Sequence, residues 1–554
     1  MKEKIIELLS GEIKGNKEKI KNLVEVPPRQ DFGDYSFPCF SVAKEENKNP
    51  LEFAKELAES LRKKLPEEIT NVSFKGAYVN FFIDKKIFAK KVLSESQKKS
   101  FGTFAKKNPK KILIDMSSPN IAKPFGIGHL RSTIIGNAIS NIARASGDKT
   151  VKINYLGDWG TQFGKVILGY KKWGDEKKLK ENPSRHLLEL YAKTNSEEYE
   201  KQAREEFKKL ENGDRENISL WKKFRDISLK EFEKIYRLLG VSFDVVSGES
   251  KYNDKMDFVV EKLKEKKLVK KDDGALIVDL KSENLGVALI QKDDGTSLYV
   301  TRDIAAAISR KEEYGFDEMV YEVGSEQKLH FSQVFKILEL LGYSWAKNLK
   351  HVSHGLYLDK DGKKFATRKG KTVFMSEILG EVIEKAKKEL SSREDLSDTE
   401  LDRRARKIAV AAIIYGDLKN YRENNIIFDI DKFLSFEGDT GPYLLYSYAR
   451  ASSIIRKVKS KAKLKIIDFH DVEIKLLKKI SDFPEIIKKS YKNLSPNLIA
   501  NYSFELAQIF NEFYHSCPVL GGIEEAFRLK LVNSFRNTLK KSLALLGIEV
   551  LEEM

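Results

Sequence analysis

Cysteines and long apolar runs are scarce or absent in this sequence. Its 554 residues include only two cysteines, Cys39 and Cys517, which excludes a disulfide framework and a cysteine-rich zinc site. No apolar run is long enough to span a bilayer, and the charged N-terminus lacks the apolar core of a signal peptide. We therefore expect a cytoplasmic protein that binds no membrane.

The common glycine-rich motifs for phosphate binding are also missing. The sequence contains neither a P-loop nor a G-x-G-x-x-G motif. No internal repeat, low-complexity tract or long linker stands out either. A nucleotide site in this chain would therefore have to use other residues.

The length and composition that are present fit a large enzyme of several domains. A chain of 554 residues that is 41% hydrophobic has room for about three domains. The chain has 100 basic and 83 acidic residues, and its net charge is +17. This excess suits a polyanionic partner such as RNA, although general lysine enrichment of a genome would give the same balance.

The most informative segment is Asp115–Ser132, which reads DMSSPNIAKPFGIGHLRS. It follows a strand candidate at Ile112–Ile114 and opens a helix whose apolar residues recur close to a 3.6 period. A second strand candidate, Val151–Tyr155, alternates apolar and polar residues. Strand, helix and strand in this order are typical of the start of a doubly wound nucleotide-binding fold.

Small residues and a histidine stand where the first strand meets this helix. Gly126 and Gly128 would let a ligand approach the backbone, and the free N–H groups of a helix start attract phosphate. The imidazole of His129, in the first turn, can donate a hydrogen bond to a phosphate oxygen. For a lone G-x-G-H, a tight structural turn with a packed histidine is the simpler interpretation.

The whole string resembles the first signature of class I aminoacyl-tRNA synthetases, in the form that the arginyl enzymes use. The usual core of that signature is His-x-Gly-His. Here Gly126 replaces the first histidine and His129 matches the second. The resemblance implies that Gly126, Gly128 and His129 bind ATP and that His129 also acts in catalysis.

Two further segments resemble the same family. The string GDWGTQFG at Gly157–Gly164 nearly matches the arginyl enzymes letter for letter, although a structural turn anchored by its tryptophan would also explain it. The charged, helical residues from about 170 resemble the insertion that splits the class I nucleotide fold. We place this insertion at about 170–290 and expect turns at Asp272–Gly274 and Asp293–Gly295.

A candidate site for a cationic substrate begins at Ser297–Asp303, where we expect a strand to feed a helix over Ile304–Glu312. Tyr299 and Asp303 would straddle this junction, and a carboxylate there can pair with a guanidinium through two hydrogen bonds. From the spacing alone, helix capping is the more economical role for Asp303.

The resemblance gives these residues a substrate. In the arginyl family, the tyrosine, aspartate and glutamine of Y-x-T-R-D and S-x-Q-x-L-H contact arginine, and they match Tyr299, Asp303 and Gln327. The resemblance adds Asp115 and Asn120 to this arginine site. An acidic residue at 115 suits either cationic end of the amino acid.

A basic loop occupies Lys360–Lys371, where six of the twelve residues are lysine or arginine. Such a loop can close over a triphosphate and neutralise developing charge, although Asp361–Gly362 would equally suit a solvated hairpin. The loop resembles the second class I signature, usually Lys-Met-Ser-Lys-Ser, with Thr367 in place of the second lysine.

The arginyl enzymes that lack this second lysine commonly carry a lysine just ahead of the first signature. Lys123 stands at that position. The resemblance therefore implies that Lys123 stabilises the reacting phosphates. It gives Lys364 and Arg368 catalytic roles as well, and it gives Lys369 a role in ATP binding.

The two ends of the chain predict further domains. Residues 1–100 combine helix candidates with strand-like runs and resemble the extra N-terminal domain of arginyl enzymes, which contacts the tRNA corner. From about 400 the chain is helical, and GPYLLYSYARASSI from Gly441 resembles the start of the family's anticodon-binding domain. We therefore expect an α/β domain at 1–100, a Rossmann-like doubly wound parallel sheet with its insertion at 101–395, and an all-α bundle at 396–554.

Together these resemblances imply a class I arginine–tRNA ligase. It would form arginyl-adenylate from L-arginine and ATP, and pass arginine to the 2′-hydroxyl of the terminal adenosine of tRNA(Arg). We expect Mg²⁺ to accompany ATP, no protein-bound metal or zinc, and a monomer. The alternatives are a small-molecule adenylating or nucleotidyl-transferring enzyme, and a catalytically inactive tRNA-binding relative, for which Gly126 and Thr367 are the grounds.

Overall fold

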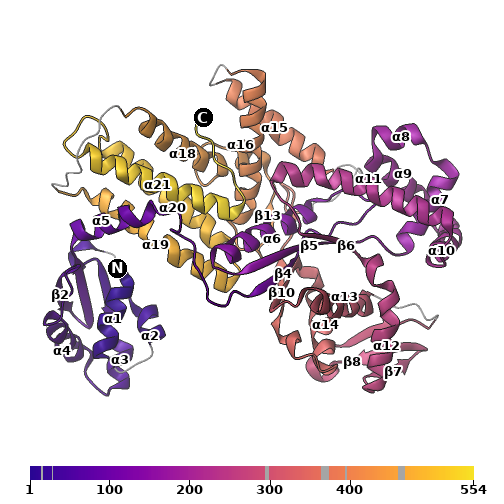
Figure 1. Ribbon diagram of the computed structural model, residues 1–554, viewed down its shortest axis with the longest axis horizontal. Coiled ribbons are helices and arrows are strands. Elements are labelled where there is room, and N and C mark those ends of the chain that lie inside the picture. Colours follow the sequence, from indigo (N-terminus) through magenta and orange to yellow (C-terminus); the bar gives the residue numbers. More distant parts are fainter. Residues whose placement is uncertain (14–16, 28, 294–298, 364–373, 393–395, 459–467) are drawn as a thin grey trace. The chain divides into compact units, whose positions relative to one another are not determined.

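The computed structural model describes residues 1–13, 17–27, 29–293, 299–363, 374–392, 396–458 and 468–554. The chain forms two compact units, each assembled from three stretches. The first unit comprises residues 1–101, 454–481 and 509–537, and the second comprises 102–453, 482–508 and 538–554. Figure 1 labels their helices and strands.

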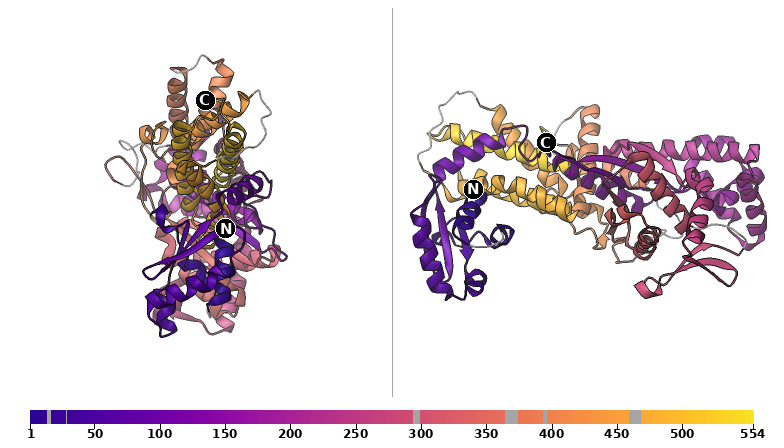
Figure 2. Two further views of the ribbon diagram at one scale, coloured as in Figure 1. Left: turned by 90° about the vertical axis from the view of Figure 1, so that its left-hand side faces the viewer. Right: turned by 60° about the horizontal axis from the view of Figure 1, so that its bottom comes forward.

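The N-terminal part of the first unit is an α/β module, drawn in indigo in Figures 1 and 2. Its described strands form an antiparallel sheet of order β1-β3-β2, and helix α4 packs against β2 and β3. Asn49 caps α4 by accepting from the Leu51 N–H, and Pro50 takes the first helical position. The elements are α1 (Lys2–Glu12), α2 (Lys17–Leu23), β1 (Tyr35–Pro38), α3 (Phe40–Glu45), α4 (Pro50–Arg62), β2 (Ile69–Lys75), β3 (Tyr78–Ile83) and α5 (Lys85–Ser96).

The turn at Phe32–Tyr35 is structural in this unit. Gly33 has a φ of +91°, and a Cβ there would lie 2.7 Å from the backbone of β3, so glycine is required. The carboxylate of Asp34 accepts from the Ile83 N–H at 2.9 Å and lies 2.7 Å from the Nζ of Lys478. The turn thus connects the sheet to helix α19 (Asp471–Asn493), which carries Lys478.

The described strands of the second unit include a parallel sheet of order β11-β10-β4-β5-β6. Renumbered along the chain, these five strands have the order 3-2-1-4-5 of a doubly wound fold, as the sequence predicted. The order reverses between β4 and β10, and ligands bind such sheets outside the carboxyl ends of the strands at this reversal. The strands are β4 (Lys111–Asp115), β5 (Lys149–Leu156), β6 (Val245–Gly248), β10 (Glu318–Gly324) and β11 (Leu349–His354).

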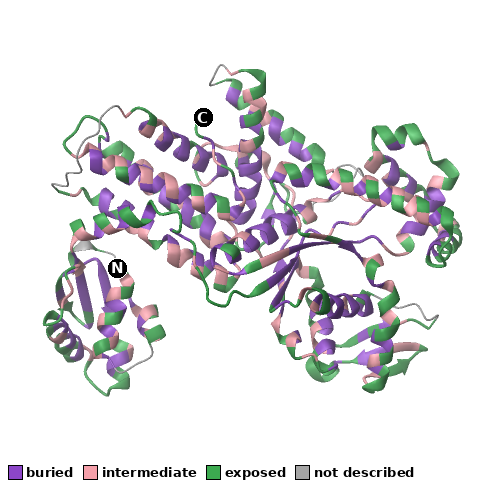
Figure 3. Ribbon diagram, in the orientation of Figure 1, coloured by how far each residue is buried: buried purple, intermediate pink, exposed green. Residues whose placement is uncertain are grey.

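Helices cover both faces of this sheet, which is therefore buried along most of its length (Figure 3). Figure 1 shows α6 (Ile127–Ala145) on one face, and α13 (Tyr299–Tyr314) with α14 (Lys328–Leu340) on the other. The core beneath α13 contains the strand residues Leu113, Ile153 and Met319. Side chains alternate along a strand, so the residues two positions later point the same way. They are Asp115, Tyr155 and Tyr321.

The insertion between β5 and α13 is helical and then hairpin-like. The helix predicted from its charged residues is confirmed, as is the turn at Asp272–Gly274, which joins β7 and β8. The turn expected at Asp293–Gly295 lies mostly outside the described residues. The elements are α7 (Thr161–Trp173), α8 (Glu176–Glu181), α9 (Pro183–Thr194), α10 (Glu197–Glu211), α11 (Arg215–Leu239), α12 (Met256–Glu265), β7 (Val269–Asp272), β8 (Ala275–Asp279) and β9 (Val287–Gln291).

The strand expected at Ser297–Asp303 is wrong for the part that the structure describes. Helix α13 already includes Tyr299, so Tyr299 and Asp303 lie one turn apart on a helix and do not straddle a strand end. The aromatic and β-branched residues of Tyr-Val-Thr favour a strand locally. Packing of Val300 and Ile304 into the core beneath α13 outweighs that preference.

The remaining described elements are mostly helices, as expected for residues after about 400. They are β12 (Tyr357–Leu358), α15 (Met375–Ser391), α16 (Asp398–Leu418), β13 (Ile426–Ile427), α17 (Ile430–Leu434), α18 (Gly441–Arg456), α19 (Asp471–Asn493), α20 (Asn497–Ser516) and α21 (Glu525–Leu546). Among the described helices, none has the length and hydropathy needed to cross a membrane.

A buried arginine joins the nucleotide fold to these later elements within the second unit. Arg131 of α6 donates to the carbonyl oxygens of Asn424, at 2.8 Å, and Arg422, at 3.0 Å. Its Nε lies 3.3 Å from a carboxylate oxygen of Asp417 in α16, and both side chains are 1% exposed. Asp417 also accepts from the hydroxyl of Tyr357. This network fixes α6, and with it the start of the candidate site, against α16.

Candidate active site

The loop after β4 is strained and firmly held. Ser117, Ser118 and Ala122 have φ angles of +74°, +48° and +59°, and such left-handed backbone costs on the order of 1–2 kcal/mol per residue. Ser132 of α6 accepts from the Ser117 N–H at 2.9 Å, and Ser228 of α11 accepts from the Ala122 N–H at 2.9 Å. The insertion and α6 therefore together fix this loop at the carboxyl end of β4.

The first turn of α6 carries a neutral histidine. The Gly126 N–H donates to Nδ1 of His129 at 3.0 Å, which places the ring proton on Nε2. Burial, with smaller contributions from His354 and Lys123, lowers the pKa of His129 to about 4. At pH 7 the imidazole is therefore uncharged and offers Nε2–H as a donor.

No described residue fills the space in front of this helix start. The N–H groups of Ile127 and Gly128 make no hydrogen bond to any described residue. A Cβ on Gly128 would meet nothing within 4 Å, and one on Gly126 would touch only the His129 ring at 3.6 Å. Free donors at a helix N-terminus suit a phosphate group.

Lys123 lies three residues before Gly126 and has no carboxylate partner in the described part of the chain. Its Nζ lies 5.2 Å from the centre of the Tyr191 ring in α9. Partial burial lowers the pKa of Lys123, and the nearby Lys165 adds to this effect. The ammonium is thus available to an anionic ligand in front of α6.

The predicted phosphate-binding residues Lys364, Arg368 and Lys369 lie outside the described residues. The first residue of α15, which follows this segment closely, is anchored at the candidate site. The N–H of Met375 donates to the carbonyl oxygen of Phe125 at 3.3 Å. The start of α15 therefore lies beside Phe125, just before the start of α6.

Asp115 lies at the end of β4 and already has a partner within the protein. Its Oδ2 accepts from Nη1 of Arg310 at 2.8 Å, and its Oδ1 accepts from the Ser118 hydroxyl at 3.0 Å. Asp115 is 2% exposed and Arg310 is 1% exposed. Burial raises the pKa of Asp115, while Arg310 and Ser118 act to lower it. Because Asp303 also raises this pKa, the two predicted acids lie close enough to interact.

Asp303 does not cap a helix, which removes the structural alternative from the sequence. It lies one turn inside α13, and its Oδ2 is 2.6 Å from Nε2 of His330 in α14. Both side chains remain about one-fifth exposed, at 20% and 21%. A carboxylate in this position can receive a ligand from the solvent side.

Two other predicted arginine contacts lie at the surface near this carboxylate. Tyr299, at the start of α13, is 61% exposed and stacks loosely with Arg302, whose guanidinium carbon is 5.8 Å from the ring centre. Gln327, in the turn between β10 and α14, is also exposed. Tyr299 lies one helical turn before Asp303 on α13. Gln327 lies three residues before His330, whose ring contacts Asp303.

Two acids that the sequence analysis did not assign lie at the same edge of the sheet. Asp158 is fully buried and accepts from the Ser250 N–H at 2.8 Å and its hydroxyl at 2.9 Å. Glu249, just after β6, lies 3.2 Å from Arg302. Burial raises the pKa of Glu249 to about 7. Arg302 opposes this shift, and Asp303 adds to it. The position after a strand's carboxyl end was the signal that could have identified Glu249.

Asn120 contacts the second sequence motif. It forms an isolated parallel bridge with Gly157, and a Cβ on that glycine would lie 2.2 Å from the Asn120 side-chain oxygen. The GDWG segment therefore packs directly against the loop after β4. Gly157 is required by this close approach and not by its own backbone angles.

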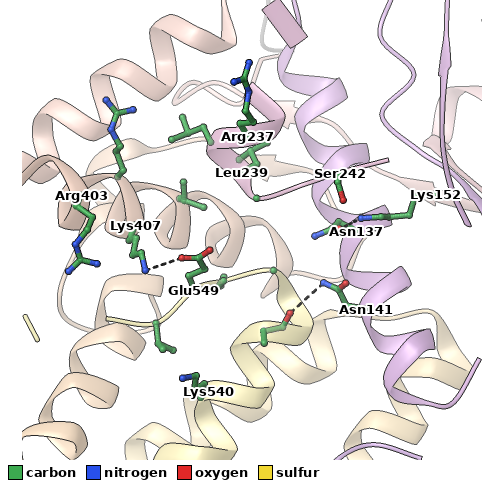
Figure 4. A pocket seen from close by; sticks show the side chains of 18 of the residues that line it. Asn137, Asn141, Lys152, Arg237, Leu239, Ser242, Arg403, Lys407, Lys540 and Glu549 are labelled. Carbon is green, nitrogen blue, oxygen red and sulfur yellow. Dashed lines mark hydrogen bonds and ion pairs between the residues drawn. The ribbon is translucent and has the colours of Figure 1, made fainter. Parts of the chain in front are cut away.

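A separate cavity of about 1260 Å³ lies farther along α6, beside Asn137 and Asn141 (Figure 4). Basic side chains dominate its lining, among them Lys152, which donates to Asn137 at 3.2 Å, and Lys407, which pairs with Glu549 at 2.9 Å. Asn137 is eight residues beyond His129, or about 12 Å along the helix axis, so this cavity is distinct from the candidate site.

No group of three or more metal-binding side chains occurs among the residues that the structure describes. The site instead combines a carboxylate-lined region around Asp303, Glu249 and Asp115 with uncharged N–H donors at the start of α6. The first suits a cationic ligand and the second an anionic one. Both lie at the carboxyl ends of the parallel strands.

Comparison with known protein families covers nearly the whole chain. Residues 89–430 match the family described as tRNA synthetases class I (R), catalytic domain. Residues 444–554 match the DALR anticodon binding domain, and residues 1–83 match the arginyl tRNA synthetase N terminal domain.

Individual relatives and solved structures agree with these matches. The arginine–tRNA ligases of Clostridioides difficile and Clostridium perfringens are 44% and 43% identical to this chain. The alignments cover 100% and 97% of this chain, and 98% and 97% of the relatives. The structure of the Thermus thermophilus arginyl-tRNA synthetase aligns with a TM-score of 0.83 at 26% identity, over 96% of each chain. That of the Plasmodium falciparum enzyme aligns with a TM-score of 0.79 at 27% identity, over 96% of this chain and 94% of that one. The chain therefore belongs to the arginyl-tRNA synthetases of class I.

Proposed function

We propose that this chain ligates arginine to tRNA(Arg) through an adenylate, with the residues of the candidate active site in defined roles. Asp303 and Glu249 receive the guanidinium of L-arginine, and Tyr299 and Gln327 enclose it. Asp115 and Asn120 receive the α-ammonium end. Because two acids meet the side chain, a substrate with a delocalised cation is favoured over a neutral one.

The observation that carries this proposal is the carboxylate excess around α13. Glu249 and Asp303 interact unfavourably with each other, and this contributes to a pKa of about 7 for Glu249. Arg302 is the sole guanidinium with an ion pair to either acid among the described side chains. A bound guanidinium would relieve this repulsion and pair with both carboxylates.

ATP is the second substrate, and the start of α6 is proposed to hold its phosphates. Nε2–H of His129 and the free N–H groups of Ile127 and Gly128 supply uncharged donors. Lys123 supplies a positive charge, with Lys364, Arg368 and Lys369 as further contributors. Open space at Gly126 and Gly128 lets the phosphates approach the backbone.

In the first step, a carboxylate oxygen of arginine bonds to the α-phosphorus of ATP, and the bond to the bridging oxygen breaks to release pyrophosphate. The carboxylate is already ionised, so no general base is needed. Catalysis then consists of positioning and of stabilising charge on the phosphates. We propose that Mg²⁺ arrives with ATP and lowers the charge of the triphosphate, because Mg²⁺ is commonly bound through substrate phosphates with few protein ligands.

In the second step, the 2′-hydroxyl of the terminal adenosine of tRNA bonds to the arginyl carbon, and AMP leaves. The net charge of +17 and the basic cavity beside α6 favour a polyanionic partner of this size. We assign residues 1–100 to the tRNA corner, 101–395 to catalysis and 396–554 to the anticodon. We further propose a monomer that works in the cytoplasm, where ATP and uncharged tRNA are both present.

The decisive experiment is aminoacylation of total tRNA with each of the twenty radiolabelled amino acids in turn. Arginine alone should be incorporated, and incorporation should require ATP. Incorporation of another amino acid would overturn the assigned substrate. Binding of tRNA without any charging would instead support a catalytically inactive relative.

A further inference from the structure

We infer that Arg310 is a positioning residue for the amino end of the substrate: it holds the Asp115 carboxylate in place, with one oxygen directed toward the α-ammonium of arginine. This inference rests on the proposed function and adds a residue that the sequence motifs do not include. Arg310 lies on α13, seven residues after Asp303 and 195 positions along the chain from Asp115.

The geometry of the pair divides the two oxygens of Asp115. Nη1 of Arg310 donates to Oδ2 at 2.8 Å. Among the described residues, Oδ1 accepts only from the Ser118 hydroxyl, at 3.0 Å. A carboxylate oxygen can accept two hydrogen bonds, so Oδ1 keeps one position for a ligand donor. Ser118 itself is held with a φ of +48° in the strained loop.

Asp115 is the one carboxylate that pairs with this guanidinium among the side chains that the structure describes. Three tyrosine rings surround Arg310, with centres 4.5 Å away at Tyr155, 5.9 Å at Tyr321 and 6.0 Å at Tyr252. Its Nε and Nη2 have no hydrogen-bond partner in the described part of the chain. Aromatic faces stabilise a buried cation without competing for the acid.

Without Arg310, the pKa of Asp115 would rise further, because the guanidinium is the strongest influence that lowers it. Burial already raises its pKa, and Asp303 raises it further. Among the described residues, Ser118 donates its hydroxyl to Asp115 and Tyr321 lies near enough to interact with it, and neither side chain carries a positive charge. A protonated Asp115 would lose its charge and could no longer attract an ammonium group.

One helix then sets the distance between the two ends of the substrate site. Positions i and i+7 lie on the same helix face, about 10 Å apart along the axis. Asp303 of α13 faces the guanidinium end, and Arg310 fixes Asp115 at the other end. Helix α13 therefore determines the distance between the carboxylates of Asp303 and Asp115.

The test compares L-arginine with 5-guanidinopentanoate, the same molecule without its α-amino group, in direct binding to the full chain. In Arg310→Met, affinity for L-arginine should fall about 10- to 100-fold, the loss expected for one charged hydrogen bond. Affinity for the analogue should change less than about threefold. In Arg310→Lys, which restores the charge, part of the lost L-arginine affinity should return.

A pH series separates positioning from general damage. In Arg310→Met, the ratio of L-arginine affinity to analogue affinity should rise between pH 6 and pH 9, because only L-arginine requires the ionised Asp115 and both ligands share the pH dependence that comes from Glu249. Arg131→Met, which removes an equally buried arginine paired with Asp417, is the matched control and should show no such selectivity. If Arg310→Met does not fold, the same comparison in Arg310→Lys decides, with a smaller selective loss expected.

Equal losses for the two ligands, or no loss for either, would overturn the positioning role of Arg310. Failure of the proposed function has a different signature. In that case the unmodified chain would bind no L-arginine, or would bind it no more tightly than the analogue.

Discussion

The carboxylate of Asp303 and the imidazole of His330 join helices α13 and α14 through a contact of 2.6 Å between Oδ2 and Nε2. The contact occupies one oxygen and leaves Oδ1 uncommitted among the described residues. It also orients the carboxylate from outside its own helix. Asp303 is therefore preorganised as an acceptor, which lowers the entropy cost of binding a planar donor.

Replacing Asp303 with asparagine should raise the KM for arginine about 10- to 100-fold, because a charged acceptor is lost and an N–H group faces a ligand that only donates. The KM for ATP should stay nearly constant. Steady-state aminoacylation with each substrate varied in turn measures both values.

Glu312→Gln is the matched control for that experiment, since it removes an exposed acid from the same helix. It should leave both KM values unchanged. An Asp303→Asn enzyme with normal arginine KM and normal melting temperature would show that Asp303 does not contact the substrate.

His129→Ala should slow arginyl-adenylate formation about 100- to 1000-fold, the usual effect of losing one preorganised donor to a developing charge. Affinity for arginine should change little. Because the pKa of His129 is about 4, the size of this effect should be the same at pH 6 and pH 8. Arginine-dependent pyrophosphate exchange in the presence of tRNA provides the measurement, and an unimpaired rate would remove His129 from the mechanism.

Lys123→Ala should be more damaging than Lys364→Ala. Thr367 replaces the second lysine of the basic loop, so Lys123 is expected to be the ammonium nearest the reacting phosphates. Single-turnover adenylate formation compares the two variants directly. Lys165→Ala is a control, because Lys165 pairs with Glu200 at 3.1 Å on the insertion. A harmless Lys123→Ala would contradict the assignment.

The affinity for arginine should rise as pH increases through about 7 and then level off. Glu249 has a pKa of about 7 without ligand, and a bound guanidinium favours its charged form, so binding below this pH must release a proton. The change should approach tenfold per pH unit well below the pKa. Calorimetry of arginine binding from pH 5.5 to 8.5 measures it. Glu249→Gln should bind weakly and lose the pH dependence at neutral pH, whereas an unaltered profile would exclude Glu249 from the site.

Arg131→Met should destabilise the fold by about 3–5 kcal/mol, because it leaves the Asp417 carboxylate buried without its cation. Adding Asp417→Asn should recover part of that loss. Denaturant unfolding of the single and double variants measures both. If the second substitution simply adds a further loss, the two residues do not act as a pair.

Local patterns in the sequence predicted much of the fold. Strong helical periodicity after Gly126 placed α6 within a few residues, and the alternation at Val151–Tyr155 lies within β5. The same logic failed at Tyr299, where three strand-favouring residues belong to a helix because the core beneath them requires one. Local propensity determines the secondary structure of a segment where tertiary packing favours neither alternative. Elsewhere, packing determines it.

The site could be predicted only in part for a related reason. Motifs pointed to Asp115 and Asp303 because each lies in a distinctive string. Arg310 and Glu249 carry no such string, and their roles arise from contacts between segments far apart in the chain. The order of the strands brings the ends of β4 and β6 to the same edge of the sheet. That order depends on how all five strands pair, so no single segment of the sequence reveals it.

The three left-handed residues after β4 make the protein less stable than it would be with glycine at these positions. Glycine at position 122 would remove the steric conflict that alanine has at a φ of +59°, and would give back only part of this gain through a more flexible unfolded chain. A chain selected for stability alone would therefore accept glycine there. Alanine lowers the stability of the fold but restricts the loop to one backbone conformation. We therefore expect substitutions that stabilise this loop to lower the turnover rate.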